Sequence, residues 1–149
     1  MGYVAANPPP RAPNPLSRFV DAQAATYDRA LAELRRGQKT GHWMWFVFPQ
    51  IAGLGRSPTA QLYAITDLAE ARAYLAHPVL GPRLVEAVEA LLALPGRDAH
   101  AVLGAPDDLK LRSCLTLFQA ADPGEPVFGR ALEKYFAGRE DLLTLEKLG

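Results

Sequence analysis

The residues best suited to chemistry lie in two stretches of the chain, around His42 and around Lys110. His42 begins the aromatic segment HWMWFVFPQ, which spans residues 42–50. An imidazole titrates near neutral pH, so a histidine at the mouth of an aromatic wall could serve as a general acid or base where solvent reaches it. The simpler alternative is an imidazole that hydrogen-bonds to a helix end. We therefore treat His42 as a candidate catalytic residue, with the structural role left open.

Lys110 falls on the apolar face of a helix expected to begin near residue 107. On that helix it projects between Cys114 and Leu117. An ammonium group in such a position must extend to solvent, pair with a buried acid or line a cavity. Extension to solvent is easy in a first helical turn. Lys110 is therefore the second candidate catalytic residue, with solvent extension as the alternative.

Other side chains near these two stretches could bind a ligand. The amide of Gln50 could contact a polar ligand edge or satisfy backbone groups in a turn. Residues 53–58, GLGRSP, form a glycine-rich loop before a helix start, where free N–H groups can bind an anion, although no known phosphate-binding motif is matched. The predicted ligand-binding residues are Trp43, Trp45, Gln50, Arg56, Ser57, Arg112 and Ser113.

Several classes of site and partner are disfavoured. The three histidines and the single cysteine, Cys114, lack metal-ligand spacing, so no metal site is predicted. No G-x-S-x-G elbow or Cys–His pairing is present, and no cofactor is predicted. Sixteen basic and sixteen acidic residues give a formal net charge of zero, which disfavours a general nucleic-acid or membrane surface. A small anionic ligand is the remaining predicted partner, and the oligomeric state stays open.

The elements that must position these residues are predicted to be helices. Start signals occur at Ser57–Pro58, at Thr66 or Asp67, at Pro106 and at Pro126. Residues 27–37 have an apolar helical face, with Glu33 on the opposite, polar side. Residues 43–48 could be a buried strand, yet no partner strand is found, so we interpret them as helical. The predicted fold is all-α: a single compact domain of about six to eight short helices around an aromatic-rich core.

The 149 residues, 49% of them hydrophobic, suffice for one domain. Residues 1–15 are predicted to be a proline-rich N-terminal tail, and residues 16–149 the helical domain. No secretory signal is visible, and no apolar run reaches the roughly 20 residues of a membrane span. We therefore expect a cytoplasmic protein.

Five motifs occur in one order along the chain. They are RFVDAQ (18–23), HWMWFVFPQ (42–50), GLGRS (53–57), AYLAHPVLGPRL (73–84) and KLRSCLTLF (110–118). Together they resemble the bacterial family numbered eighteen-ten among the domains of unknown function, often labelled calpastatin. The resemblance covers roughly residues 16–148. It implies a compact, mainly α-helical domain and carries no agreed activity.

Two hypotheses of function follow. In the first, a pocket between residues 42–50 and the helix starting near 107 binds a small anionic ligand, with or without acid/base chemistry. In the second, the domain is a non-catalytic interaction or oligomerisation module. A solvent-connected cavity reached by His42 and Lys110 favours the first. A filled centre beside an exposed apolar patch favours the second. Whether the protein is an enzyme is left open.

Overall fold

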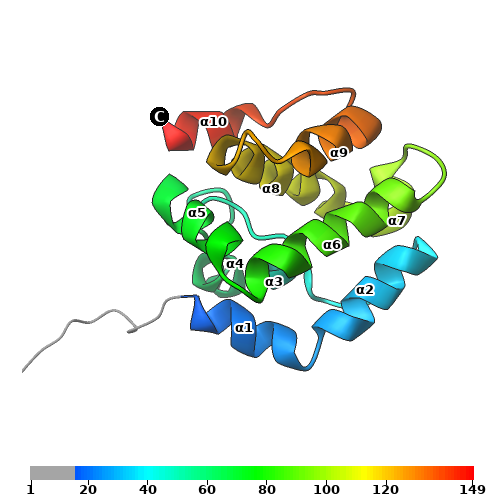
Figure 1. Cartoon of the computed structure of the whole chain (residues 1–149), viewed down its shortest axis with the longest axis horizontal. Helices are drawn as coiled ribbons and strands as arrows, with labels where there is room; N and C mark the ends of the chain where they lie inside the picture. Colours follow the sequence, from blue (N-terminus) through cyan, green and yellow to red (C-terminus); the bar gives the residue numbers. More distant parts are fainter. Residues whose placement is uncertain (1–15) are drawn as a thin grey trace, which may run out of the picture.

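Ten helices and no strand make up residues 16–149, the part of the chain that the computed structural model describes (Figure 1). The predicted tail, residues 1–15, lies outside the described residues. The helices are α1 (Ser17–Ala24), α2 (Tyr27–Arg36), α3 (Met44–Val47), α4 (Pro58–Leu62), α5 (Leu68–Ala76), α6 (Leu80–Ala93), α7 (Ala99–Leu103), α8 (Asp107–Ala121), α9 (Pro126–Phe136) and α10 (Leu142–Leu148). The all-α prediction is confirmed, with short helices in addition to the six to eight expected.

Capping side chains explain the helix starts predicted at Ser57–Pro58 and at Asp67. Ser57 accepts a hydrogen bond from the N–H of Ala60 at the start of α4, and Asp67 accepts one from Glu70 at the start of α5. The two helices that the sequence reading did not anticipate, α7 and α10, are capped in the same way by Asp98 and Asp141. Each of these contacts lies within a few residues of its helix, which is why such starts are visible in the sequence.

Helix α8 is the central helix, and α5, α7, α9 and α10 all contact it. Its buried face carries Leu111, Cys114, Leu115, Leu117 and Phe118, all without solvent exposure. The ring of Phe118 lies 5.3 Å from that of Tyr74 on α5 and 5.9 Å from that of Phe128 on α9. Helix α6 packs against α2, α5 and α9 and completes the core. None of the helices within residues 16–149 is long and apolar enough to cross a lipid bilayer.

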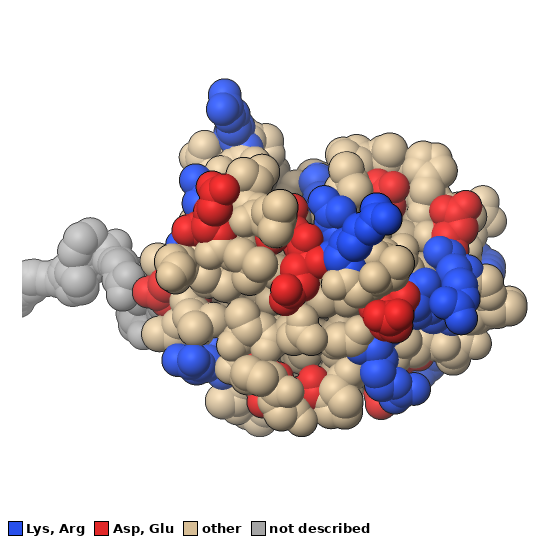
Figure 2. Space-filling model, turned by 90° about the horizontal axis from the view of Figure 1, so that it is seen from above, with Lys and Arg blue, Asp and Glu red and all other residues tan. Residues whose placement is uncertain are grey.

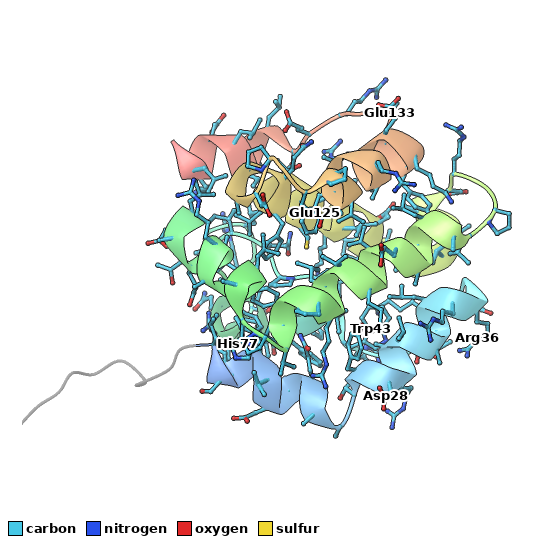
Figure 3. All side chains as sticks on the ribbon, in the orientation of Figure 1. Asp28, Arg36, Trp43, His77, Glu125 and Glu133 are labelled. Carbon is cyan, nitrogen blue, oxygen red and sulfur yellow. The ribbon has the colours of Figure 1, made fainter. Side chains whose placement is uncertain are left out.

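The aromatic segment is helical for a single turn only, α3. Trp43 and Phe48, on either side of this turn, are buried in the core, and Figure 3 shows Trp43 inside the molecule while Asp28 and Arg36 point outward from α2. Trp45 and Phe46 are partly exposed. Beyond the turn the chain is extended, and Ile51 forms an isolated parallel bridge with Ile65. The segment thus forms both the centre of the core and part of its edge.

A buried amide joins α1 to this segment. The helix ends before Ala25, yet Gln23 remains buried at 1% exposure. Its Nε2 donates to the Phe46 carbonyl at 2.7 Å and to the Tyr74 hydroxyl at 3.2 Å. These partners satisfy the polar group inside the core, so Gln23 helps position the aromatic segment.

Candidate functional site

Lys110 and the aromatic segment meet in what we call the lysine–tryptophan cluster, formed by Lys39, Trp43, Trp45, Asp107 and Lys110. The Lys110 ammonium lies 5.1 Å from the ring centre of Trp45 and 3.6 Å from Oδ1 of Asp107. Lys39 lies 5.1 Å from the ring centre of Trp43 and 2.8 Å from Oδ2 of Asp107. Two lysines therefore share one carboxylate, and each faces an indole ring. The cluster's charged groups pair with one another.

A small cavity lies next to Trp45 of this cluster. It has a volume of about 10 Å³ and lies between Trp45, Gln50, Ile51 and Tyr63, among other residues. That volume is close to what a single water molecule requires.

Glu33 holds the loop that carries His42. The sequence pattern placed Glu33 on the polar face of α2, and this was wrong, because the side chain is only 3% exposed. Its Oε1 accepts hydrogen bonds from the N–H groups of Thr40 and Gly41, at 2.8 and 2.9 Å, and from Nε1 of Trp43 at 2.9 Å. Burial alone would raise the pKa of this carboxyl, but the hydrogen bonds lower it to about 2. Glu33 therefore stays ionised, while His42 next to Trp43 is exposed.

The other predicted residues of the first half of the chain have local contacts. The Gln50 carbonyl accepts a hydrogen bond from the N–H of Ile65, and the Gln50 side chain lines the small cavity beside Trp45. Ser57 caps α4, and Arg56 is exposed, with its carbonyl bonded to Gln61. No hydrogen bond or ion pair between described residues joins the loop 53–58 to Lys110 or Arg112.

Arg112 and Ser113 face a different part of the molecule. Nη2 of Arg112 lies 3.7 Å from Oδ1 of Asp141, and the Ser113 hydroxyl donates to Oδ2 of Asp141 at 3.0 Å. Because helical residues turn by about 100° each, Arg112 projects roughly 200° around α8 from Lys110. The predicted site residues on α8 thus belong to two separate surroundings.

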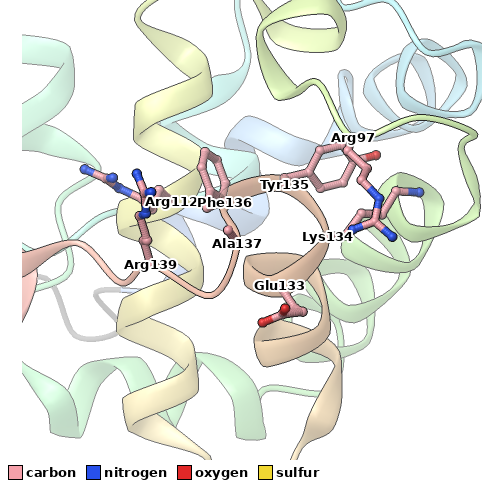
Figure 4. Close-up of a pocket in the computed structure, with 8 residues that line it drawn as sticks. All are labelled: Arg97, Arg112, Glu133, Lys134, Tyr135, Phe136, Ala137 and Arg139. Atoms are coloured by element: carbon pink, nitrogen blue, oxygen red, sulfur yellow. The ribbon is translucent and has the colours of Figure 1, made fainter.

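Arg112 also lines a hollow of about 490 Å³ at the C-terminal end of α9 (Figure 4). We call it the arginine hollow; its lining residues are Arg97, Arg112, Glu133, Lys134, Tyr135, Phe136, Ala137 and Arg139. Arg97 and Arg139 are exposed and form no ion pair with any residue of 16–149. The Nε atom of Arg112 is buried and has no hydrogen-bond partner in the described structure. Figure 2, which looks onto α9 and α10 from above, shows Lys and Arg side chains interspersed with acidic side chains on this face.

Two further side chains of the arginine hollow have structural roles. The ammonium of Lys134 donates to the carbonyls of Leu91, Leu92 and Leu94 at the end of α6. The Tyr135 hydroxyl donates to the Leu91 carbonyl, and burial raises the pKa of this phenol above its usual value. These two groups hold α9 against α6. The three arginines are the groups left to meet a ligand.

Comparison with known proteins shows the family to which this chain belongs. The family model described as "Protein of unknown function (DUF1810)" matches residues 13–148. The chain belongs to this family. The crystal structure of the conserved hypothetical protein Rv1873 from Mycobacterium tuberculosis is similar, with 50% sequence identity, 92% of this chain and 98% of that chain covered, and a TM-score of 0.89. No curated protein matches the chain. Membership in the DUF1810 family confirms the resemblance drawn from the ordered motifs.

Within this DUF1810 fold, sequence reasoning missed Arg97, Arg139 and Lys39. Arg97 precedes α7 and Arg139 follows α9, so only the packing of three segments brings them to one hollow with Arg112. No local pattern in the sequence marks residues of that kind. Residues 16–149 contain no group of three or more His, Cys, Asp or Glu side chains placed to hold a metal ion.

Proposed function

We propose that the protein binds a small anion, a phosphate or a carboxylate, in the arginine hollow. The observation that carries the proposal is that Arg97, Arg112 and Arg139 line one hollow, although only Arg112 has an ion-pair partner within residues 16–149. Arg112 and Arg139 lie together at one end of the hollow and Arg97 lies at the other (Figure 4). The ion pair of Arg112 is long, at 3.7 Å, and leaves Nε of Arg112 without an acceptor. Guanidinium groups bind phosphate and carboxylate oxygens through paired hydrogen bonds, so an anion would satisfy these donors.

This location differs from the one that the sequence predicted. The sequence predicts a pocket between residues 42–50 and the start of α8, where the charged groups of the lysine–tryptophan cluster pair with one another. The arginine hollow lies where Arg112, one of the predicted ligand-binding residues, points. The proposed ligand is therefore still a small anion, but the proposed site lies on a different side of α8 from the one predicted from the sequence.

We propose only that the arginine hollow binds an anion, without a catalytic step. The phenol of Tyr135 is already engaged with the Leu91 carbonyl. His42, the candidate acid or base, is not among the residues that line the arginine hollow. Glu133 lines it, and Figure 4 shows its carboxylate directed away from the arginines.

Calorimetric titration in a buffer without phosphate tests the proposal, with inorganic phosphate, pyrophosphate and citrate as probes. We expect saturable binding that weakens as salt is added, because the arginines are partly open to solvent. Arg97→Gln and Arg139→Gln change exposed residues, so both variants should fold normally. Arg139→Gln should lower the affinity about tenfold, as expected for loss of a charge-assisted contact. Arg97→Gln should lower it less, because Arg97 lies at the other end of the hollow. Arg112→Gln should abolish binding.

Arg130→Gln is the matched control, because Arg130 is an exposed arginine of α9 that does not line the hollow. An equal loss of affinity in this variant would contradict a localised site, as would the absence of binding by all three anions. Loss of binding in Lys110→Met and His42→Gln, with the arginine variants unchanged, would return the ligand to the aromatic side.

The second hypothesis, an interaction or oligomerisation module, is favoured by a separate observation. Leu142 and Leu143 at the start of α10 are 73% and 56% exposed. Sedimentation velocity over a range of protein concentrations tests for self-association through this surface.

A further inference from the structure

The arginine hollow adjoins a second hollow of a different character. This apolar hollow has a volume of about 560 Å³ and is lined by Arg112, Arg139, Glu140, Asp141, Leu142 and Leu143. Arg112 and Arg139 line both hollows, so the two meet at this pair of guanidinium groups. Of the two hollows, only the second has leucine side chains in its lining.

The exposed leucines are unusual within the described chain. Only Leu62, Leu109, Leu142 and Leu143 are large hydrophobic side chains with high exposure among residues 16–149, and two of these four are adjacent in the apolar hollow. Contact between neighbouring leucines and water is unfavourable in free energy, and an apolar group that covers them removes this cost. An aliphatic group of a ligand would cover both.

The charges set the direction in which such a ligand would lie. Glu140 and Asp141 line the apolar hollow together with Arg112 and Arg139, so its charges balance and it holds no surplus positive charge for a second anionic group. Both Asp141 oxygens are engaged, Oδ2 by Thr144 and Ser113 and Oδ1 by Arg112, so the carboxylate is not free to move away. An uncharged chain fits this hollow, while an anionic end fits the arginine side.

We propose that the ligand is a single-chain amphipathic anion, an alkyl phosphate or alkyl carboxylate, with its headgroup between Arg112 and Arg139 and its chain over Leu142 and Leu143. This inference rests on the proposed anion binding and adds the class of ligand. Each hollow has the volume usual for small-molecule sites, whereas a free phosphate ion would occupy the arginine side alone.

Titration of the full chain with inorganic phosphate and with butyl, hexyl and octyl phosphate, each below its critical micelle concentration, tests the inference. Burial of a methylene group strengthens binding by about threefold to fourfold, so the dissociation constant should fall by about that factor per added methylene. In a Leu142→Ser/Leu143→Ser double variant the dependence on chain length should disappear while the affinity for inorganic phosphate stays unchanged. Leu62→Ser, at a leucine 55% exposed on α4, is the matched control and should behave as the parent.

The outcomes separate this inference from the proposed function. Binding of inorganic phosphate with no gain from chain length overturns the inference and leaves anion binding intact. Failure of phosphate and all alkyl phosphates overturns both. Two further results overturn the inference. One is binding to phosphatidylglycerol vesicles that needs both leucines, without binding of monomeric octyl phosphate. The other is a dimer that the double variant converts to monomer.

Discussion

At the residue scale, a single carboxylate oxygen of Glu33 organises the loop between α2 and α3. The loop's N–H groups and the Trp43 indole converge on it, so folding favours the ionised form of the carboxyl. The neighbouring lysine–tryptophan cluster is also self-contained, because Asp107 has two cationic partners. The two arrangements connect residues 39–43 to α2 and α8.

Acid should weaken the fold through Glu33. Its pKa falls from an ordinary value of 4.5 to about 2 on folding, so its contribution is complete above pH 4.5 and is lost as the pH falls toward 2. The shift corresponds to about 3 kcal/mol. Urea unfolding of Glu33→Gln should therefore show a loss at pH 7 that shrinks at pH 3. A loss of equal size at both pH values would show that ionisation of Glu33 does not matter.

The two lysines that share Asp107 should differ in their effect on stability. Lys110→Met leaves Asp107 paired with Lys39 at 2.8 Å, so it should cost less than about 1 kcal/mol in urea unfolding. Lys39→Met removes the closer, more buried partner and should cost about 3 kcal/mol. The reverse order would mean that Lys110 is the main partner of Asp107.

At the element scale, the junction of α5 and α6 depends on a residue without a side chain. Gly81 lies in the first turn of α6, and a Cβ atom built there would lie 2.0 Å from the carbonyl oxygen of Leu75 on α5. The obstacle is backbone, which cannot rotate away as a side chain can. The two helices therefore approach closely only because residue 81 is glycine.

Gly81→Ala should accordingly lower the free energy of unfolding by at least about 2 kcal/mol, measured in urea. Gly129→Ala on α9 is the control, because its added Cβ would meet the end of the flexible Gln119 side chain. There the gain in helix propensity, about 1 kcal/mol, offsets a small shift of the glutamine. Equal losses in the two variants would rule out the close approach of α5 and α6 as the cause.

At the scale of the whole molecule, Cys114 reports on global unfolding. It lies without exposure in the central helix α8, and burial raises the pKa of its thiol. A thiol reagent should therefore label it only when the core opens, with a protection free energy within about 1 kcal/mol of that from urea unfolding. The control is Ser57→Cys in a Cys114→Ala background. Residue 57 is exposed at the start of α4, so the reagent should label this cysteine at once. Rapid labelling of native Cys114 would indicate local opening around α8.

The sequence by itself determined the helical fold, most helix starts and the family. These follow from short-range physics. The side chains of Ser57 and Asp67 each cap the helix that begins at the next residue, by accepting from an N–H three residues along, and ordered motifs need no tertiary information. The sequence also placed Lys110 near the aromatic segment, since both had to face the core.

Tertiary structure alone decided how the candidate site is composed. Glu33 is buried because residues 38–43 fold back over α2, an event that the helical pattern of α2 cannot express. Arg97, Arg112 and Arg139 line one hollow because α9 packs against both α6 and α8. Such an arrangement depends on contacts between residues far apart in the chain, and no local spacing encodes it.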